Sequence, residues 1–177
     1  MDTEKGLSAL PKSLKAGLIA TLVLLAALLV INQPLKTGPA HQGIVSYQLA
    51  GNAEQALAIV QSWGAEGLRW AKLSLWVDFL FIPLYCLTLI MLTRHCTLDR
   101  PGVRERNVAR WIRTLFITAG LADVTENVLL LNNLDAPTDA ISLAATLSAL
   151  AKFTALTLGI AGLVIIRAAR RHPLAPG

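Results

Sequence analysis

The sequence predicts an all-α fold: a polytopic membrane protein whose four transmembrane helices form a bundle. Of its 177 residues, 54% are apolar and only 15% are charged, and the mean hydropathy is +0.56. Soluble domains carry roughly a quarter charged residues, so this balance favours a membrane protein. Four apolar stretches are each long enough for a bilayer crossing, which takes about 20 residues. We therefore expect residues 1–177 to form a single integral membrane domain.

The four predicted spans run over residues 14–33, 73–93, 112–131 and 140–166. The first follows a basic segment, as the apolar part of a cleaved signal peptide does. Its apolar core is longer than that of a usual signal peptide, so we expect an uncleaved span. The connection between the third and fourth spans is short, which predicts that these two helices are antiparallel neighbours.

Basic residues are unevenly distributed between the two sides that the spans define. Most of the sixteen Lys and Arg residues lie in the N-terminal segment, in the loop 94–111 and in the C-terminal segment. The positive-inside rule places these parts in the cytoplasm and makes residues 34–72 an extracytoplasmic loop. We expect a multi-pass protein of the cell inner (plasma) membrane with cytoplasmic N and C termini. The net charge of +5 then indicates contact with anionic lipids and no binding of nucleic acid.

The loop 34–72 contains a predicted amphipathic helix. Asn52 stands at the N-cap position with Gln55 three residues later, and Gly64 is a stop signal. We expect this helix to lie flat in the headgroup layer, with Trp63 and Trp70 as interfacial anchors. The alternative is a lid over the outer end of the bundle. The apolar face, at spacing i, i+3, i+4 and i+7, consists of Ala56, Ile59, Val60 and Trp63.

Four ionisable residues interrupt the apolar spans: Asp78 in the second, Asp123 and Glu126 in the third, and Lys152 in the fourth. A charge at membrane depth costs at least ~2.5 kcal/mol, so such side chains face the bundle interior and have partners. At about 1.5 Å per residue, the three acids lie in the outer half of the membrane. Lys152 starts nearer the midplane, and its flexible stem reaches toward them. We therefore expect one cluster.

Helical spacing adds polar neighbours from the third and fourth spans. Asn127 shares a face with Asp123 and Glu126. Ser148 precedes Lys152 by one turn within a stripe of small residues, which turns Lys152 toward the bundle. A serine and a lysine at this spacing resemble a nucleophile and its base, but packing is the commoner role of such a serine.

The second span contributes Tyr85, which shares a face with Asp78. Pro83 lies between them, lacks an N–H group and frees the carbonyl of Phe79. We expect a kink or a spare hydrogen-bond acceptor there.

Three acids and one lysine leave an excess of negative charge in a medium of low dielectric constant. Either a carboxyl group stays protonated, with Asp123 and Glu126 as the pair that shares a proton, or a cation is bound. The candidate catalytic residues, which are also the candidate ligands of a hard divalent cation such as Mg²⁺ or Ca²⁺, are Asp78, Asp123 and Glu126. The candidate ligand-binding residues are Tyr85, Asn127, Ser148 and Lys152.

Three functions are compatible with this cluster. The first is a site that binds or processes a lipid or small amphiphile in the outer half of the membrane. The second is a proton- or cation-coupled carrier subunit, whose acids titrate during transport. The third is a structural or assembly protein, in which a buried salt-bridge network provides specificity without chemistry. The expected partners are membrane lipids, together with a second copy of the chain or another membrane protein.

Three stretches resemble a group of small, uncharacterised bacterial inner-membrane proteins with four spans. They are residues 44–63, Asp78–Phe81 with Tyr85, and Gly120–Asn127, and together they cover about half of the chain. The resemblance implies the four-span architecture and no particular activity. Membrane hydrolases of the ceramidase type pair acids with histidines, and the predicted spans contain no histidine.

Overall fold

The chain folds into a bundle of long helices. The computed structural model describes residues 10–98 and 103–171; the segments at 1–9, 99–102 and 172–177 lie outside the described residues, and so do both predicted cytoplasmic termini. Within the described ranges there is no strand, and four helices are long and apolar enough to cross a membrane. The predicted all-α bundle of four spans is therefore confirmed.

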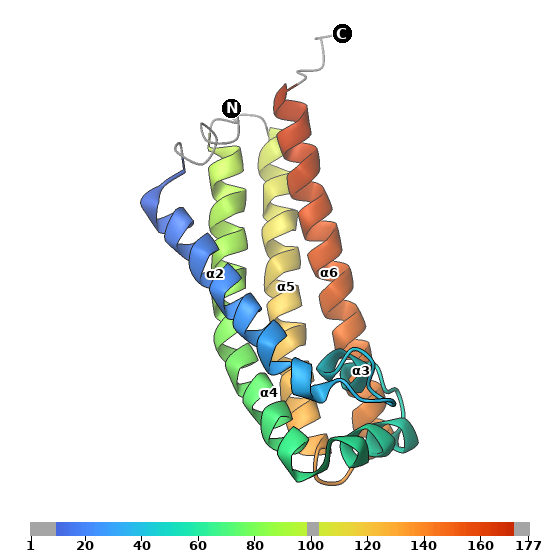
Figure 1. Cartoon of the computed structure of the whole chain (residues 1–177). Helices are drawn as coiled ribbons and strands as arrows, with labels where there is room; N and C mark the ends of the chain where they lie inside the picture. The colour runs from blue at the N-terminus through green and yellow to red at the C-terminus, as the bar shows by residue number, and fades with distance from the viewer. Residues whose placement is uncertain (1–9, 99–102, 172–177) are drawn as a thin grey trace.

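The bundle consists of α2 (Lys12–Ile31), α4 (Ala53–Thr97), α5 (Val103–Asn133) and α6 (Asp139–Arg171). The second, third and fourth predicted spans each lie within one of these helices. The first predicted span, residues 14–33, extends two residues beyond α2 and reaches the 3₁₀ turn η1 (Gln33–Leu35). In Figure 1, α4, α5 and α6 run side by side, whereas α2 crosses α4 obliquely. The antiparallel helices α5 and α6 pack most extensively, as their short connection predicts.

The two ends of the bundle differ in charge. α2 begins, α4 ends, α5 begins and α6 ends at one end (Figure 1), which we call the basic end. The opposite end carries α3 (Ile44–Gln48), and we call it the α3 end. That the basic end faces the cytoplasm stays a prediction of the charge rule. The described basic residues near the basic end are Lys12, Lys15, Arg94, Arg106, Arg110, Arg113 and Arg167.

The predicted amphipathic helix forms the first part of α4. Asn52 is its N-cap, with Oδ1 accepting a hydrogen bond from the backbone N–H of Gln55 at 2.8 Å. The helical backbone is interrupted at Gly64, with φ 60° and ψ −166°, so residues 53–63 are a separate helical segment, as predicted. The backbone dihedral angles stay helical through Pro83, so the break in α4 is at Gly64.

The apolar face of residues 53–63 packs against protein. Trp63 is only 6% exposed and lies in a core cluster with Leu130 of α5 and Leu134, the residue after α5, while its indole N–H donates to the Leu35 carbonyl at 2.7 Å. The expectation that Trp63 anchors the helix in the headgroup layer is therefore wrong, because the end of the bundle offers this indole both an apolar contact and an acceptor. Residues 53–63 cover the α3 end, as the lid alternative predicts.

Polar contacts fix α3 between the neighbouring helices. Oδ1 of Asn32 accepts from the backbone N–H of Ile44 at 2.8 Å, and the hydroxyl of Thr146 on α6 donates to the Gln48 carbonyl at 3.0 Å. Tyr47 is buried, and burial raises the pKa of its hydroxyl above the ordinary value, so this phenol stays neutral. These contacts place Gln48 beside the transmembrane part of the bundle.

Candidate ligand-binding site

Glycines let α5 approach both α4 and α6 closely. A Cβ atom at Gly120 would lie 2.5 Å from Sγ of Cys86 on α4. One at Gly159 of α6 would lie 2.5 Å from Cε1 of Phe116 on α5. Neither helix pair could pack this tightly with a larger residue at these positions. The polar face of α5 is therefore enclosed between its neighbours.

Lys152 forms a buried ion pair with two acids at once. Its Nζ lies 3.0 Å from Oδ1 of Asp123 and 2.7 Å from Oε2 of Glu126. The side chains of the three residues are 7%, 5% and 0% exposed, in the order Lys152, Asp123 and Glu126. The predicted convergence of the third and fourth spans is thus observed. This buried ion pair is also what the third functional alternative, a structural protein with a buried salt-bridge network, predicts.

Two hydrogen bonds attach the second span to this ion pair. The Tyr85 hydroxyl on α4 donates to Oδ2 of Asp123 at 3.0 Å. Nδ2 of Asn127 donates to Oδ2 of Asp78 at 2.7 Å. Three helices therefore contribute to one network, which we call the carboxylate cluster: Asp78, Tyr85, Asp123, Glu126, Asn127 and Lys152.

The innermost part of the carboxylate cluster is incompletely hydrogen-bonded. In the described part of the chain, Oε1 of Glu126 has no hydrogen-bond donor, and Oε2 meets only the Lys152 ammonium group, at 2.7 Å. Oδ1 of Asn127 also has no donor, and both residues are fully buried. Each buried polar group without a partner costs about 1–3 kcal/mol. The network therefore holds more acceptors than its own donors satisfy.

Two adjoining grooves open beside the carboxylate cluster. One, of about 280 Å³, lies along α4 and α6, and the other, of about 220 Å³, lies along α2 and α4; neither is enclosed. They share Gln48, Asp78, Phe81 and Phe153, and we call them together the lateral groove. The first is also lined by Tyr85, Leu89, Asp123, Lys152, Leu156 and Ile160, and the second by Leu25, Leu28 and Leu29 of α2.

The predicted site residues are distributed unequally around this groove. Asp78, Asp123, Tyr85 and Lys152 line it, whereas Glu126 and Asn127 lie behind them. Ser148 is partly buried, lines neither groove and makes no side-chain hydrogen bond among the described residues, so the structure gives a serine–lysine nucleophile no support.

The structure likewise adds nothing in favour of the divalent-cation alternative. Across residues 10–98 and 103–171, no group of three His, Cys, Asp or Glu side chains is placed to hold a metal ion. Lys152 takes the position between Asp123 and Glu126 that a cation shared by these two acids would need. The Mg²⁺ or Ca²⁺ site proposed for Asp78, Asp123 and Glu126 stays a prediction.

The lateral groove is also lined by three residues that the sequence did not predict as site residues: Gln48, Phe81 and Phe153. Gln48 is 7% exposed, and its Oε1 has no hydrogen-bond partner in the described structure. It lies outside every predicted span, in a helix too short to show a periodic pattern. The available signal was one glutamine between Tyr47 and Leu49, in an otherwise mostly apolar stretch.

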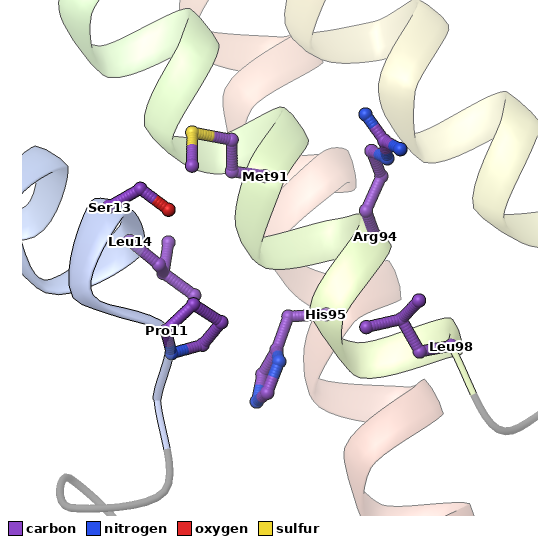
Figure 2. Close-up of a pocket in the computed structure, with 7 residues that line it drawn as sticks. All are labelled: Pro11, Ser13, Leu14, Met91, Arg94, His95 and Leu98. Atoms are coloured by element: carbon purple, nitrogen blue, oxygen red, sulfur yellow. The ribbon is translucent and has the colours of Figure 1, made fainter.

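A separate cavity of about 280 Å³ lies at the basic end, between the start of α2 and the end of α4 (Figure 2). The His95 ring borders it, and Nδ1 of this ring has no hydrogen-bond partner among the described residues. Arg94 extends away from Pro11 across the cavity (Figure 2). No acidic residue of the described chain lines this cavity, and it is separate from the carboxylate cluster.

Comparison with protein-family models, curated proteins and solved structures gives no match to this chain. The resemblance to small four-span bacterial membrane proteins therefore stays an expectation. The geometry of the site is therefore what bears on function.

Proposed function

We propose that this protein binds a lipid or another small amphiphile in the lateral groove. The observation that carries the proposal is the meeting of a charged network and apolar walls in one open groove. Ligand sites of this kind combine a mostly apolar surface with a few placed polar groups. A network that served packing alone would need no groove, so the groove supports binding over the structural alternative.

The groove separates a polar part from an apolar part. Asp78 and Gln48 lie where the two grooves meet, while Leu89, Leu156 and Ile160 extend the first groove toward the basic end. From Asp78 to Leu89, α4 rises about 16 Å. A polar head group would therefore lie near α3, and an alkyl chain would run along α4 and α6.

The ion pair of Lys152 with Asp123 and Glu126 has a structural role in the proposed site. The ion pair holds α6 against α5 and fixes the Asp123 carboxylate toward Tyr85. If the protein processes its ligand, proton transfer falls to Asp78, because this acid borders the groove and has no cation within ion-pair distance.

The test uses an alkyl alcohol with a diazirine in its chain, photo-crosslinked to the protein in detergent micelles. Leu156→Trp fills the groove, whereas Leu158→Trp adds the same side chain to a position that is 55% exposed and outside the groove. We expect labelling of Phe153 and its neighbours to be lost in Leu156→Trp and retained in Leu158→Trp. Equal labelling of both variants would contradict the proposal.

A specific observation supports a second candidate, the proton-coupled carrier. Glu126 is a fully buried acid whose Oε1 has no hydrogen-bond donor among the described residues, and it lies one helical turn from the groove-lining Asp123. Such an acid suits transient protonation from the groove. Proton flux into proteoliposomes should then vanish in Glu126→Gln and persist in Glu66→Gln, which changes an exposed acid. Unchanged flux in Glu126→Gln would exclude this candidate.

A further inference from the structure

We propose that the head group bound in the lateral groove is a primary ammonium group. This inference rests on the proposed function and specifies its ligand. The residues common to both grooves offer a carboxylate, an amide oxygen and two aromatic rings: Asp78, Gln48, Phe81 and Phe153. Carboxylate, amide oxygen and ring faces all attract a cation that carries N–H donors.

Asp78 brings a carboxyl group to this junction, and no described cation lies within ion-pair distance of it. Lys152, the cation nearest to it, lies between Asp123 and Glu126 and is within ion-pair distance of both. Asp78 makes its one hydrogen bond through Oδ2, to Asn127; no described side chain donates to Oδ1. A cationic ligand therefore meets an acid that forms no ion pair with any described side chain. An anionic head group would be repelled from the same place.

Gln48 supplies a second and independent indication. Its side chain is largely buried, Oε1 has no donor in the described structure, and the residue as a whole borders both grooves. Buried polar groups in native proteins nearly always have a partner. A primary ammonium group has three N–H donors, enough to satisfy Oδ1 of Asp78 and Oε1 of Gln48 together.

The need for N–H donors distinguishes between the cationic head groups that could bind here. A trimethylammonium group would still interact with Phe81 and Phe153, but it has no N–H group for Gln48. An alcohol has one donor and no charge. A single-chain primary amine therefore fits the charge and the unsatisfied acceptors at the junction of the grooves.

The experiment measures displacement of the neutral photo-crosslinking alcohol by competitors that share a dodecyl chain. The competitors are dodecylamine, which like the lysine side chain is protonated at neutral pH, dodecyltrimethylammonium, dodecanol and dodecanoate. Leu156→Trp gives the background of labelling outside the groove. We expect dodecylamine to displace the probe at a concentration at least tenfold lower than dodecanol, and dodecanoate to be the weakest competitor.

Substitutions of Asp78 and Gln48, with Glu66→Gln as the control, assign the preference to residues. Asp78→Asn should remove the advantage of dodecylamine over dodecanol, Asp78→Glu should keep most of it, and Glu66→Gln, a change to an exposed acid, should leave it unchanged. Gln48→Leu should reduce the preference for dodecylamine over dodecyltrimethylammonium. Each readout is a ratio measured on one protein, so it does not depend on the yield of folded material.

The outcomes separate this inference from the proposed function. If all four competitors displace the probe equally and Leu156→Trp abolishes labelling, the groove binds amphiphiles but the ammonium inference is overturned. An unchanged preference for dodecylamine in Asp78→Asn also overturns it. If no competitor displaces the probe and Leu156→Trp is labelled normally, the proposed function itself fails.

Discussion

At the residue scale, Lys152 determines whether the carboxylate cluster is tolerated. It lies within 3.0 Å of one acid and 2.7 Å of another, and all three side chains are buried. Breaking a buried ion pair by removal of one partner leaves an uncompensated charge, which costs more than the pair contributes. The stability of the bundle is therefore most sensitive at this one position.

We predict that Lys152→Met lowers the free energy of unfolding in detergent by about 3–5 kcal/mol, because Asp123 and Glu126 lose their counter-charge. The double variant Lys152→Met with Glu126→Gln should recover part of the loss. Lys72→Met is the matched control, because the pair of Lys72 with Asp135 at 3.4 Å is largely exposed. Its loss should be below about 1 kcal/mol. A similar loss in both lysine variants would contradict this account.

The sequence predicted most of the carboxylate cluster at this scale, and the reasons are specific. Asp123, Glu126 and Asn127 follow helical spacing, and the cost of charge in a membrane required that Lys152 reach them. The shared proton proposed for Asp123 and Glu126 stays a prediction, and the structure adds that both acids lie within ion-pair distance of Lys152. Spacing along one helix does not reveal which residue of another helix lies between two acids.

At the element scale, the contact between α5 and α6 depends on glycine. Gly159 of α6 faces the fully buried ring of Phe116 on α5. The close approach of these helices in turn brings Lys152 to the acids of α5. Small residues therefore position the site without touching it.

We predict that Gly159→Ala destabilises the protein by about 1–3 kcal/mol, since the added Cβ would lie 2.5 Å from the Phe116 ring. This loss should appear even though alanine has the higher helix propensity. Thermal unfolding in detergent provides the measurement. Adding Phe116→Leu removes the clash, so the double variant should lose less than the sum of the two single changes. Strict additivity would show that the two residues do not oppose each other.

The lid over the α3 end depends on a different glycine. Gly64 has φ 60°, and an added Cβ there would meet no atom within 4 Å, so only backbone strain opposes a larger residue. We predict that Gly64→Ala costs about 1–3 kcal/mol and speeds amide hydrogen exchange in residues 53–63. Gly38→Ala, also in open space but without a positive φ, should have little effect. Equal exchange in the two variants would argue against a strained break.

The position of the lid could not be predicted from its own sequence. An amphipathic pattern at residues 53–63 fits a headgroup layer and a protein surface equally well. In the structure this helix packs against protein, because Trp63 lies in one core cluster with Leu130 and Leu134, which are far away in the chain. The local sequence pattern shows which face of a helix is apolar. Which surface that face packs against is decided by the tertiary structure.

At the scale of the whole molecule, the fold followed from composition and hydropathy, because spans of this length must be helical in a bilayer. The lateral groove could not be predicted in this way, because the part of it that α2 lines depends on how obliquely α2 crosses α4 (Figure 1). α2 has an almost uniformly apolar surface of which only Leu14 is fully buried, so its sequence does not indicate which side contacts protein. Phe81, Phe153 and Gln48 come from α4, α6 and α3, so no single segment of the sequence shows that they line one groove.

Orientation is the prediction that belongs to this scale. In a variant without Cys86 and Cys96, a cysteine at Asp135 should react with a membrane-impermeant maleimide added to intact spheroplasts. A cysteine at Arg106, near the basic end, should react only after the membrane is permeabilised. Labelling at position 106 before permeabilisation would place the basic end outside and refute the predicted cytoplasmic termini.

The ion pair between α5 and α6 also bears on how the chain enters the bilayer during synthesis. Among the four candidate spans, α5 has the lowest mean hydropathy, 1.4, and it carries two of the acids. The next span to emerge is α6, after a short turn, and it brings the lysine that pairs with both of them. The two helices can thus be inserted as one hairpin in which this ion pair has already formed. The order of the spans, as much as their hydrophobicity, makes this protein compatible with a membrane.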